Sequence, residues 1–288
     1  MPPEGASTSS EHRLVSGRLE LAFAGDSDRC TYLQRQYASY PFHVCRVHYH
    51  DKDHPGLATL YIQSCSGGVY EDDRLDLLIA AAERAEAYVS TQSATVVHTM
   101  PLGSAAQSVR IRCESGSYLE YLPDPLILFP GSRFRSEVVV SLGGDAVALV
   151  SDSFLTHDPA GRDDRFAVYF SEIVIENESG KALAVDRLKV DGEAFAKSCP
   201  GISGQYAALG TVIVAGLNLA ARDITGELQK VRLDRDVAAI GFSPLPNFAG
   251  ILVRVLAADG AALKLALHRA WCAARLALKG SLPQERRK

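Results

Sequence analysis

Residues 60–75 read LYIQSCSGGVYEDDRL: a strand-like apolar run, a turn with two adjacent glycines, and three acidic residues before an arginine. Short apolar runs between glycine-rich turns are typical of β structure. Two later segments also join strand-like runs to small polar or acidic residues: STQSATVVHT (residues 90–99) and LEYLPDPLILF (residues 119–129). Together the three segments predict a β scaffold that carries polar side chains where a plain core would not need them.

Strand-like runs follow one another from residue 17 almost to the carboxy end. In the first run, Leu19, Leu21 and Phe23 alternate with residues that point the other way, as in a strand. Turn residues separate the runs at the short spacing of an all-β fold. The further runs span residues 31–37, 43–49, 57–64, 74–81, 86–99, 106–113, 117–122, 134–142, 145–151, 165–177, 182–190, 209–216, 237–243 and 250–256. We predict a mainly β fold, a large and mostly antiparallel scaffold of many short strands, with no visible repeat of solenoid length.

One long α-helix is predicted, at the carboxy end of the chain. From residue 262 to 279 apolar residues recur every three or four positions, among them Leu263 and Leu267, and Gly280 supplies a stop. Residues 80–87 are rich in alanine and glutamate and have helical propensity. Because strand patterns lie on both sides of that segment, we expect a turn there instead.

The composition is typical of a globular protein. The 288 residues are 47% hydrophobic and 22% charged, with a formal net charge of −4, which argues against a nucleic-acid binder with a basic face. The polar amino terminus lacks the apolar core of a signal peptide, and no apolar stretch reaches the ~20 residues of a membrane span. We expect a cytoplasmic protein with reduced cysteines. A disordered tail, residues 1–15, should precede a single domain, residues 16–288, that ends in the 262–279 helix.

The segment FHVCRVHYHDKDH, residues 42–54, contains four histidines, and the last three lie close together in sequence. On a strand, His48 and His50 would share one face, and His54 in the following turn could complete a ring of imidazole and carboxylate groups. Such ligands suit zinc or nickel, although Arg46 on the same face opposes a permanent cation. The alternative is a solvated strand edge that happens to carry several histidines.

Three consecutive acidic residues, Glu71, Asp72 and Asp73, precede Arg74. Neighbouring carboxylates repel one another unless the arginine or a cation compensates their charge. The run is therefore either a solvated loop in which Asp73 pairs with Arg74, or a transient contact for a divalent cation or a partner.

A ladder of hydroxyl groups is predicted in the second segment. On a strand, Thr91, Ser93 and Thr95 would share one face, with Gln92 on the other. Hydroxyls in this arrangement could line a wet internal passage, because buried polar groups must be satisfied by protein or ordered water. Plain cross-strand packing of threonine explains the same pattern.

Cys65 lies between two serines and before two glycines, which faintly resembles a thiol nucleophile beside an oxyanion hole. A thiol enzyme also needs a fixed histidine base, and no helix follows that would lower the thiol pKa. A tight turn is the favoured interpretation. The chain has no phosphate-binding loop, dinucleotide fingerprint, metalloprotease or serine-hydrolase motif. Any nucleotide-driven step would therefore belong to a partner.

Taken in order, these segments resemble the urease accessory protein family UreD, called UreH in some organisms. The resemblance covers most of the chain. Its motifs are GRLEL (17–21), PFHVCR (41–46), SGG with DRL (66–68 and 73–75), TQSAT (91–95), LEYLPDP (119–125), GILVRVL (250–256) and the final helix with Trp271. Each motif is weak by itself, but the ordered set is specific.

The resemblance implies a β-rich metallochaperone scaffold that is not an enzyme and has no cofactor of its own. Family members bind the accessory protein UreF, which holds the GTPase UreG, and the assembly docks on apo-urease. GTP hydrolysis by UreG accompanies nickel insertion, and the nickel ion in transit is thought to pass through a water-filled tunnel in UreD. The candidate transient nickel contacts or tunnel-lining residues are His48, His50, His54, Glu71, Asp72, Thr91, Gln92, Thr95, His98 and Glu120.

Two other functions stay open at this point. One is a cysteine-dependent hydrolase that uses Cys65, and the other is an interaction module with the UreD fold that serves another metalloprotein. The basic edge of the 262–279 helix and the 40–56 segment are candidate partner surfaces.

Overall fold

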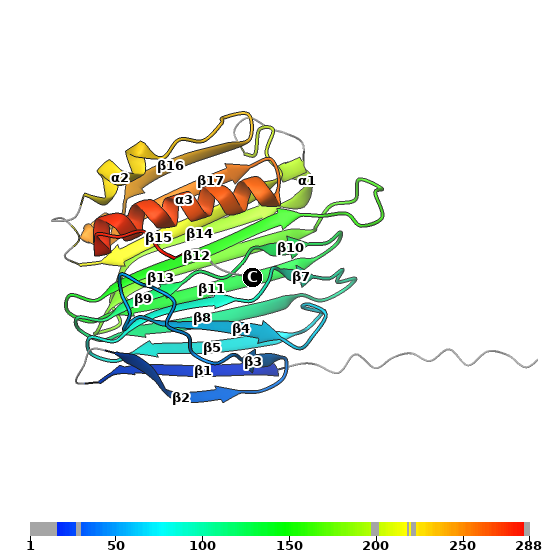
Figure 1. Ribbon diagram of the computed structural model, residues 1–288. Coiled ribbons are helices and arrows are strands. Elements are labelled where there is room, and N and C mark those ends of the chain that lie inside the picture. The colour runs from blue at the N-terminus through cyan, green and yellow to red at the C-terminus, as the bar shows by residue number, and fades with distance from the viewer. Residues whose placement is uncertain (1–15, 27–29, 197–201, 218, 220–222, 285–288) are drawn as a thin grey trace, which may run out of the picture.

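The structure is a computed structural model that describes residues 16–26, 30–196, 202–217, 219 and 223–284. Two large β-sheets pack face to face around one apolar core (Figure 1). The first sheet has the order β14 (Ala182–Asp191), β13 (Val168–Asn177), β11 (Arg133–Leu142), β8 (Ala105–Cys113), β5 (Arg74–Ala81), β1 (Ser16–Gly25) and β2 (Thr31–Ala38). The second has the order β16 (Ala238–Pro244), β17 (Gly250–Ala257), β15 (Ala208–Gly216), β12 (Val147–Thr156), β9 (Tyr118–Tyr121), β6 (Glu86–Thr91), β4 (Ala58–Ser64) and β3 (Phe42–Val44). Two short strands, β7 (Thr95–Val97) and β10 (Leu126–Leu128), attach to the second sheet through β12.

The sheets are mixed, so the prediction of a mostly antiparallel scaffold is wrong. From β4 to β13 the chain passes back and forth between the two sheets, and each return places a strand beside an earlier one in the same direction. Neighbouring strands are therefore parallel along two series. In the first sheet the series is β1, β5, β8, β11 and β13, and in the second it is β4, β6, β9 and β12. Antiparallel pairs occur only toward the two ends of this coil. Alternation of apolar residues does not distinguish the two directions, because both have a period of two.

The coil contains a structural repeat of about thirty residues that the sequence does not display. Ala58, Ala87, Leu119 and Ala148 pair in register on successive strands of the second sheet, at steps of 29, 32 and 29 residues. The connections between the sheets differ in length and composition, so no fixed period appears in the sequence. In-register pairing nevertheless places similar side chains in rows. One such row, almost completely buried, is Leu21, Ile79, Ile111, Val140 and Ile175.

The predicted carboxy-terminal helix is confirmed as α3 (Gly260–Lys279). Its amino end is capped by Asp259, whose carboxylate accepts the Ala262 amide hydrogen at 2.8 Å, and its carboxy end by Gly280 in the left-handed region. The helix covers the outer face of the second sheet and encloses a second apolar cluster there. For that reason β15 is buried along its whole length. Neither α3 nor any shorter helix in the described part of the chain has the length and hydropathy of a membrane-spanning segment.

Several boundaries differ from the sequence prediction. The expected strand at 43–49 is only the short β3, and His48 forms an isolated bridge with Thr59. The expected strand at 86–99 is divided into β6 and β7. The turn expected within 80–87 is present between β5 and β6. Three short helices were not predicted: α1 (Gly192–Ala196), α2 (Ile224–Lys230) and the 3-10 turn η2 (Pro246–Phe248). The tail expected at 1–15 lies outside the described residues.

At the start of β17 a glycine allows the backbone to lie very close to the neighbouring strand β15. Gly250 has a φ of 136°, and a Cβ atom there would lie 1.9 Å from the Val214 carbonyl oxygen. On the neighbouring strand a Cβ at Gly241 would meet no atom within 4 Å. We predict that Gly250→Ala lowers the free energy of unfolding by about 3 kcal/mol or more. Gly241→Ala should change it by less than about 1 kcal/mol. Urea titration of both variants checks this, and equal midpoints would contradict the close approach.

Candidate functional site: a polar cavity between the sheets

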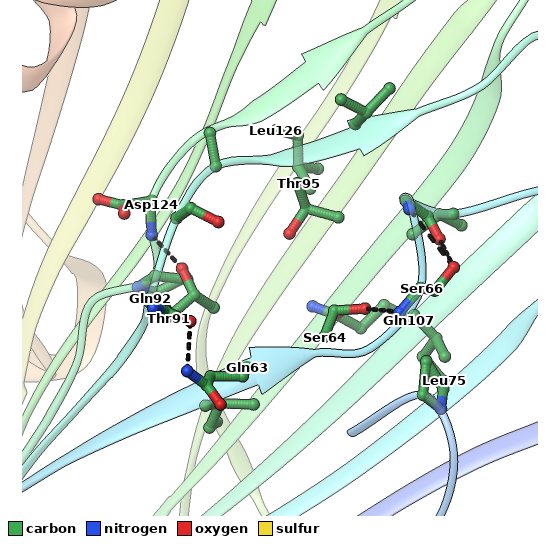
Figure 2. Close-up of a pocket in the computed structure, with 18 of the residues that line it drawn as sticks. Gln63, Ser64, Ser66, Leu75, Thr91, Gln92, Thr95, Gln107, Asp124 and Leu126 are labelled. Atoms are coloured by element: carbon green, nitrogen blue, oxygen red, sulfur yellow. Dashed lines mark hydrogen bonds between the residues drawn. The ribbon is translucent and has the colours of Figure 1, made fainter. Parts of the chain in front are cut away.

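A cavity of about 260 Å³ lies between the two sheets, near the ends of the central strands. The segments 60–75, 90–99 and 119–129 meet at it, through the Gly67–Gly68 turn, residues 91–96 and the turn at Pro123–Asp124 (Figure 2). Its inner wall combines Gln107 and Ser136 of the first sheet with residues of the second sheet. Segments far apart in the sequence therefore converge because each returns to the same end of the coil.

Three of the predicted residues, Thr91, Gln92 and Thr95, line this cavity. The Thr91 hydroxyl oxygen accepts the Asp124 amide hydrogen at 2.8 Å, which joins the second segment to the third. The Gln92 side-chain carbonyl accepts a hydrogen bond from the Gln63 amide group. These contacts explain why hydroxyl and amide residues occupy the rim, while contact with nickel stays a prediction.

Asp152 is a buried acidic residue of the cavity wall that sequence reasoning missed. It lies on β12 between Val150 and Phe154, which both face the core between the sheets. Tyr169 donates its hydroxyl hydrogen to Asp152 Oδ1 at 2.6 Å, and Ser171 donates to Oδ2. Burial raises the pKa of the Asp152 carboxyl, and the two hydroxyl donors oppose that rise. The available signal was an aspartate whose neighbours two positions away, Val150 and Phe154, are both apolar.

A row of polar side chains continues from the cavity through the interior. On the first sheet Gln107, Ser136 and Ser171 pair in register on three successive strands. On the second sheet Asp152, Thr211 and Arg254 do the same. Arg254 donates to the Thr211 hydroxyl and, at 2.8 Å, to the carboxylate of Asp186 on β14. We call these seven residues the interior polar row.

The histidines of the 42–54 segment do not form the predicted ring. The rings of His48 and His50 are stacked, with centroids 4.9 Å apart. His54 instead lies against the end of the chain, with Nε2 2.9 Å from the Ser281 hydroxyl oxygen. Within the described ranges, no group of three or more His, Cys, Asp or Glu side chains is arranged to hold a metal ion.

The acidic run builds a turn. The carboxylate of Glu71 accepts the amide hydrogens of Leu102, at 2.7 Å, and of Gly103. Asp72 has a φ of 66° and packs against Gly103, where a Cβ atom would lie 2.5 Å from Asp72 Oδ1. Asp73 is buried and accepts the Tyr70 amide hydrogen. The expected pairing of the Asp73 carboxylate with the arginine is not formed.

Arg74 instead binds backbone. It donates to the carbonyl oxygens of Asp73, at 2.9 Å, and Ser104, at 2.8 Å. The motif therefore fixes the connection between β7 and β8 to the connection between β4 and β5. Neither Glu71 nor Asp72 is among the residues that line the cavity.

Glu120 lies on the opposite face of the second sheet, completely buried beneath α3. Trp271 donates its indole hydrogen to Glu120 Oε1 at 2.9 Å, and Arg275 lies 3.4 Å from the same oxygen. Arg275 also binds Asp51 at 2.9 Å. Burial raises the pKa of Glu120, while the Arg275 charge opposes the rise. This cluster joins the helix to the sheet and to the 45–57 loop, outside the cavity.

The two remaining candidates, His98 and Cys65, lie beside the cavity. His98 stacks on Tyr70, with ring centroids 4.3 Å apart, and its Nε2 is 3.2 Å from the Gly67 carbonyl oxygen. Cys65 is exposed, and its amide donates to the Pro41 carbonyl oxygen. Across the described residues, no hydrogen bond joins the Cys65 thiol to an imidazole, so the base that a thiol nucleophile needs is not in place.

A coiled pair of mixed sheets, a covering helix and an internal polar cavity define a β scaffold protein. The chain belongs to the UreD urease accessory protein family. The model of that family, described as the UreD urease accessory protein, matches residues 15–288.

Curated relatives resemble the chain over most of its length. Urease accessory protein UreD 1 of Pseudomonas syringae pv. syringae is 39% identical over 93% of this chain and 94% of its own length. Urease accessory protein UreD 1 of Methylorubrum extorquens is 38% identical over 96% of this chain and 92% of its own length. Urease accessory protein UreD of Haloarcula marismortui is 35% identical over 91% and 87%.

The buried Asp152 predicts a pH-dependent stability difference. Because its pKa is raised in the folded chain, the folded state holds the proton more tightly than the unfolded state does. Stability from this group is therefore present at low pH and is lost as pH rises from about 4 through the folded pKa. We expect Asp152→Asn to gain stability relative to the unaltered chain between pH 4 and pH 8, measured by urea unfolding. A difference independent of pH would contradict the raised pKa.

Proposed function

We propose that this protein is a scaffold of urease maturation that passes nickel through its interior on the way to apo-urease. Membership of the UreD urease accessory protein family supports the role in maturation. The cavity and the Asp152 carboxylate in its wall carry the proposal for passage, because they place oxygen groups of both sheets in an interior that is otherwise largely apolar. Water can occupy a polar interior of this kind.

The donor groups of the cavity suit an ion in transit better than a resident one. Asp152 supplies the buried carboxylate, and Thr91, Thr95 and Gln92 supply neutral oxygen donors. A site with few ligands and no fixed coordination geometry holds a divalent cation weakly, whereas a complete set of imidazole or thiolate ligands would retain it. Conduction requires binding that is favourable enough for entry and weak enough for release.

The chemistry of the maturation reaction belongs, in this proposal, to other proteins. The chain acts in the cytoplasm without catalysing a reaction, binds UreF and through it the GTPase UreG, and docks on apo-urease. Among the residues that the structure describes, no imidazole is hydrogen-bonded to the exposed Cys65 thiol, which supports a non-catalytic role. UreG would use GTP, and nickel is the cargo.

Loss of the protein should leave urease without its metal. We predict that deletion of the gene produces apo-urease with less than about a tenth of the normal nickel content, restored by the gene supplied in trans. Urease activity and nickel per active site, measured by atomic absorption, check this. Normal holo-urease in the deletion strain would overturn the proposal and favour a UreD-fold module that serves another metalloprotein.

A charge placed in the cavity tests the passage separately from assembly. Thr95→Lys introduces an ammonium group where a cation would have to pass, so we expect nickel loading of urease to fall at least about tenfold. The complex with the partner proteins should still form. Thr225→Lys, at an exposed position of α2, is the matched control and should load urease normally. Normal loading with Thr95→Lys would remove this cavity from the route.

A further inference from the structure

Four aromatic rings form a ladder along the outside of the coil. Val69, Val97, Leu128 and Thr156 pair in parallel on four neighbouring segments. The residue that follows each of them carries a ring, and the resulting ladder is Tyr70, His98, Phe129 and His157. Neighbouring ring centroids are 4.3, 5.5 and 5.7 Å apart, within the range of favourable aromatic contacts. The first three rings are half-buried and the fourth is exposed, so the ladder presents an aromatic strip to solvent.

A rigid turn displays Leu102 in the segment that leaves this ladder. Leu102 is 94% exposed, and its amide and that of Gly103 are both bound by the Glu71 carboxylate. Asp72 packs against the same turn from the other side, so closely that a Cβ atom at position 103 would collide with its carboxylate. An exposed leucine on a mobile loop would need no explanation. Here two acidic side chains hold the backbone that presents it.

We propose that the ladder and Leu102 form a docking surface for a companion protein that remains bound between rounds of cargo delivery. Tyrosine, phenylalanine and other large apolar groups are enriched at the centres of protein interfaces. Lasting interfaces are more apolar than transient ones, and Phe129 and the exposed Leu102 supply the apolar side chains of this surface. The surface therefore fits a permanent member of the assembly rather than the urease client, which must leave.

The charges around the surface specify the partner further. Arg162 and Arg165, in the loop after His157, are paired with Asp164 and Asp163. Asp158, in the same loop, stays ionised. Desolvation opposes this, but hydrogen bonds from backbone amides lower its pKa below the ordinary value. Glu71, Asp72 and Arg74 lie on the other side, so that together with Asp158 the rim carries a net negative charge. The matching partner surface is an apolar pocket for the Leu102 side chain, bordered by basic residues.

The closing experiment rests on the proposed function, because it uses the purified accessory protein UreF as the companion. Binding of full-length chain to UreF is measured by isothermal titration calorimetry. Leu102→Ser should weaken binding at least about tenfold, as expected of an anchor residue. Glu71→Ala, which leaves the leucine in place but releases its turn, should weaken binding in the same direction. A melting temperature of Leu102→Ser close to that of the unaltered chain would show that the variant is folded.

The matched control is Phe248→Ser, which removes another side chain that is 87% exposed, at η2 between β16 and β17. It should bind UreF within about twofold of the unaltered chain. Equal weakening by Leu102→Ser and Phe248→Ser, or unchanged binding of Leu102→Ser, would overturn the docking surface alone. Failure of the unaltered chain to bind UreF would overturn the proposed partnership and this inference with it.

Discussion

Successive passes of the chain pair in parallel and in register between β4 and β13, and the other features of the molecule follow from that pairing. Register pairing converts positions about thirty residues apart into neighbours. It thereby produces the aliphatic row at Ile111, the polar row at Ser136 and the aromatic ladder at Phe129. The inner faces of the two sheets also pack against each other, so the polar side chains on both faces lie together in the interior. Closure of the cavity depends on the same pairing, since three separate turns have to arrive at one end of the coil.

Buried charge is used in two ways on the two faces of the second sheet. Beneath α3, Arg275 lies between Asp51 and Glu120, and the three groups hold helix, loop and sheet together. Removing one member of such a cluster leaves an uncompensated buried charge, which typically costs about 3–5 kcal/mol. Between the sheets, Asp152 is satisfied by two hydroxyl groups rather than by an arginine. In the first arrangement opposite charges pair with one another, and Asp51 and Arg275 also line a second pocket, of about 410 Å³. In the second, a carboxylate without an arginine partner lies at the wall of the cavity between the sheets.

Much of the secondary structure could be predicted because it depends on local patterns. The strand runs and the final helix follow from alternation, helical spacing and the Gly280 stop. The helix and most of the runs are present, but the run at 43–49 forms a strand only up to Val44 and β10 was not predicted. Strand direction could not be predicted, because parallel and antiparallel strands have the same period and the connections differ in length. The candidate site divides in the same way. Thr91, the last residue of β6, and Thr95, the first residue of β7, line the cavity, as the sequence predicted. Glu120, in an equally prominent motif, faces the helix.

The sequence by itself determined the β class, the carboxy-terminal helix and the family, since these rest on local propensity and on the order of short motifs. Only the tertiary structure decided which polar residues meet. Asp152 accepts hydrogen bonds from Tyr169 and Ser171, and Glu71 binds the turn at Leu102. His54 contacts Ser281, after the final helix, and not the other histidines. The physical reason is that the register between strands decides which face of the sheet a side chain occupies. The same register decides which residue of the next parallel strand lies beside it. That register is fixed by packing of the whole coil and leaves no local mark on the chain.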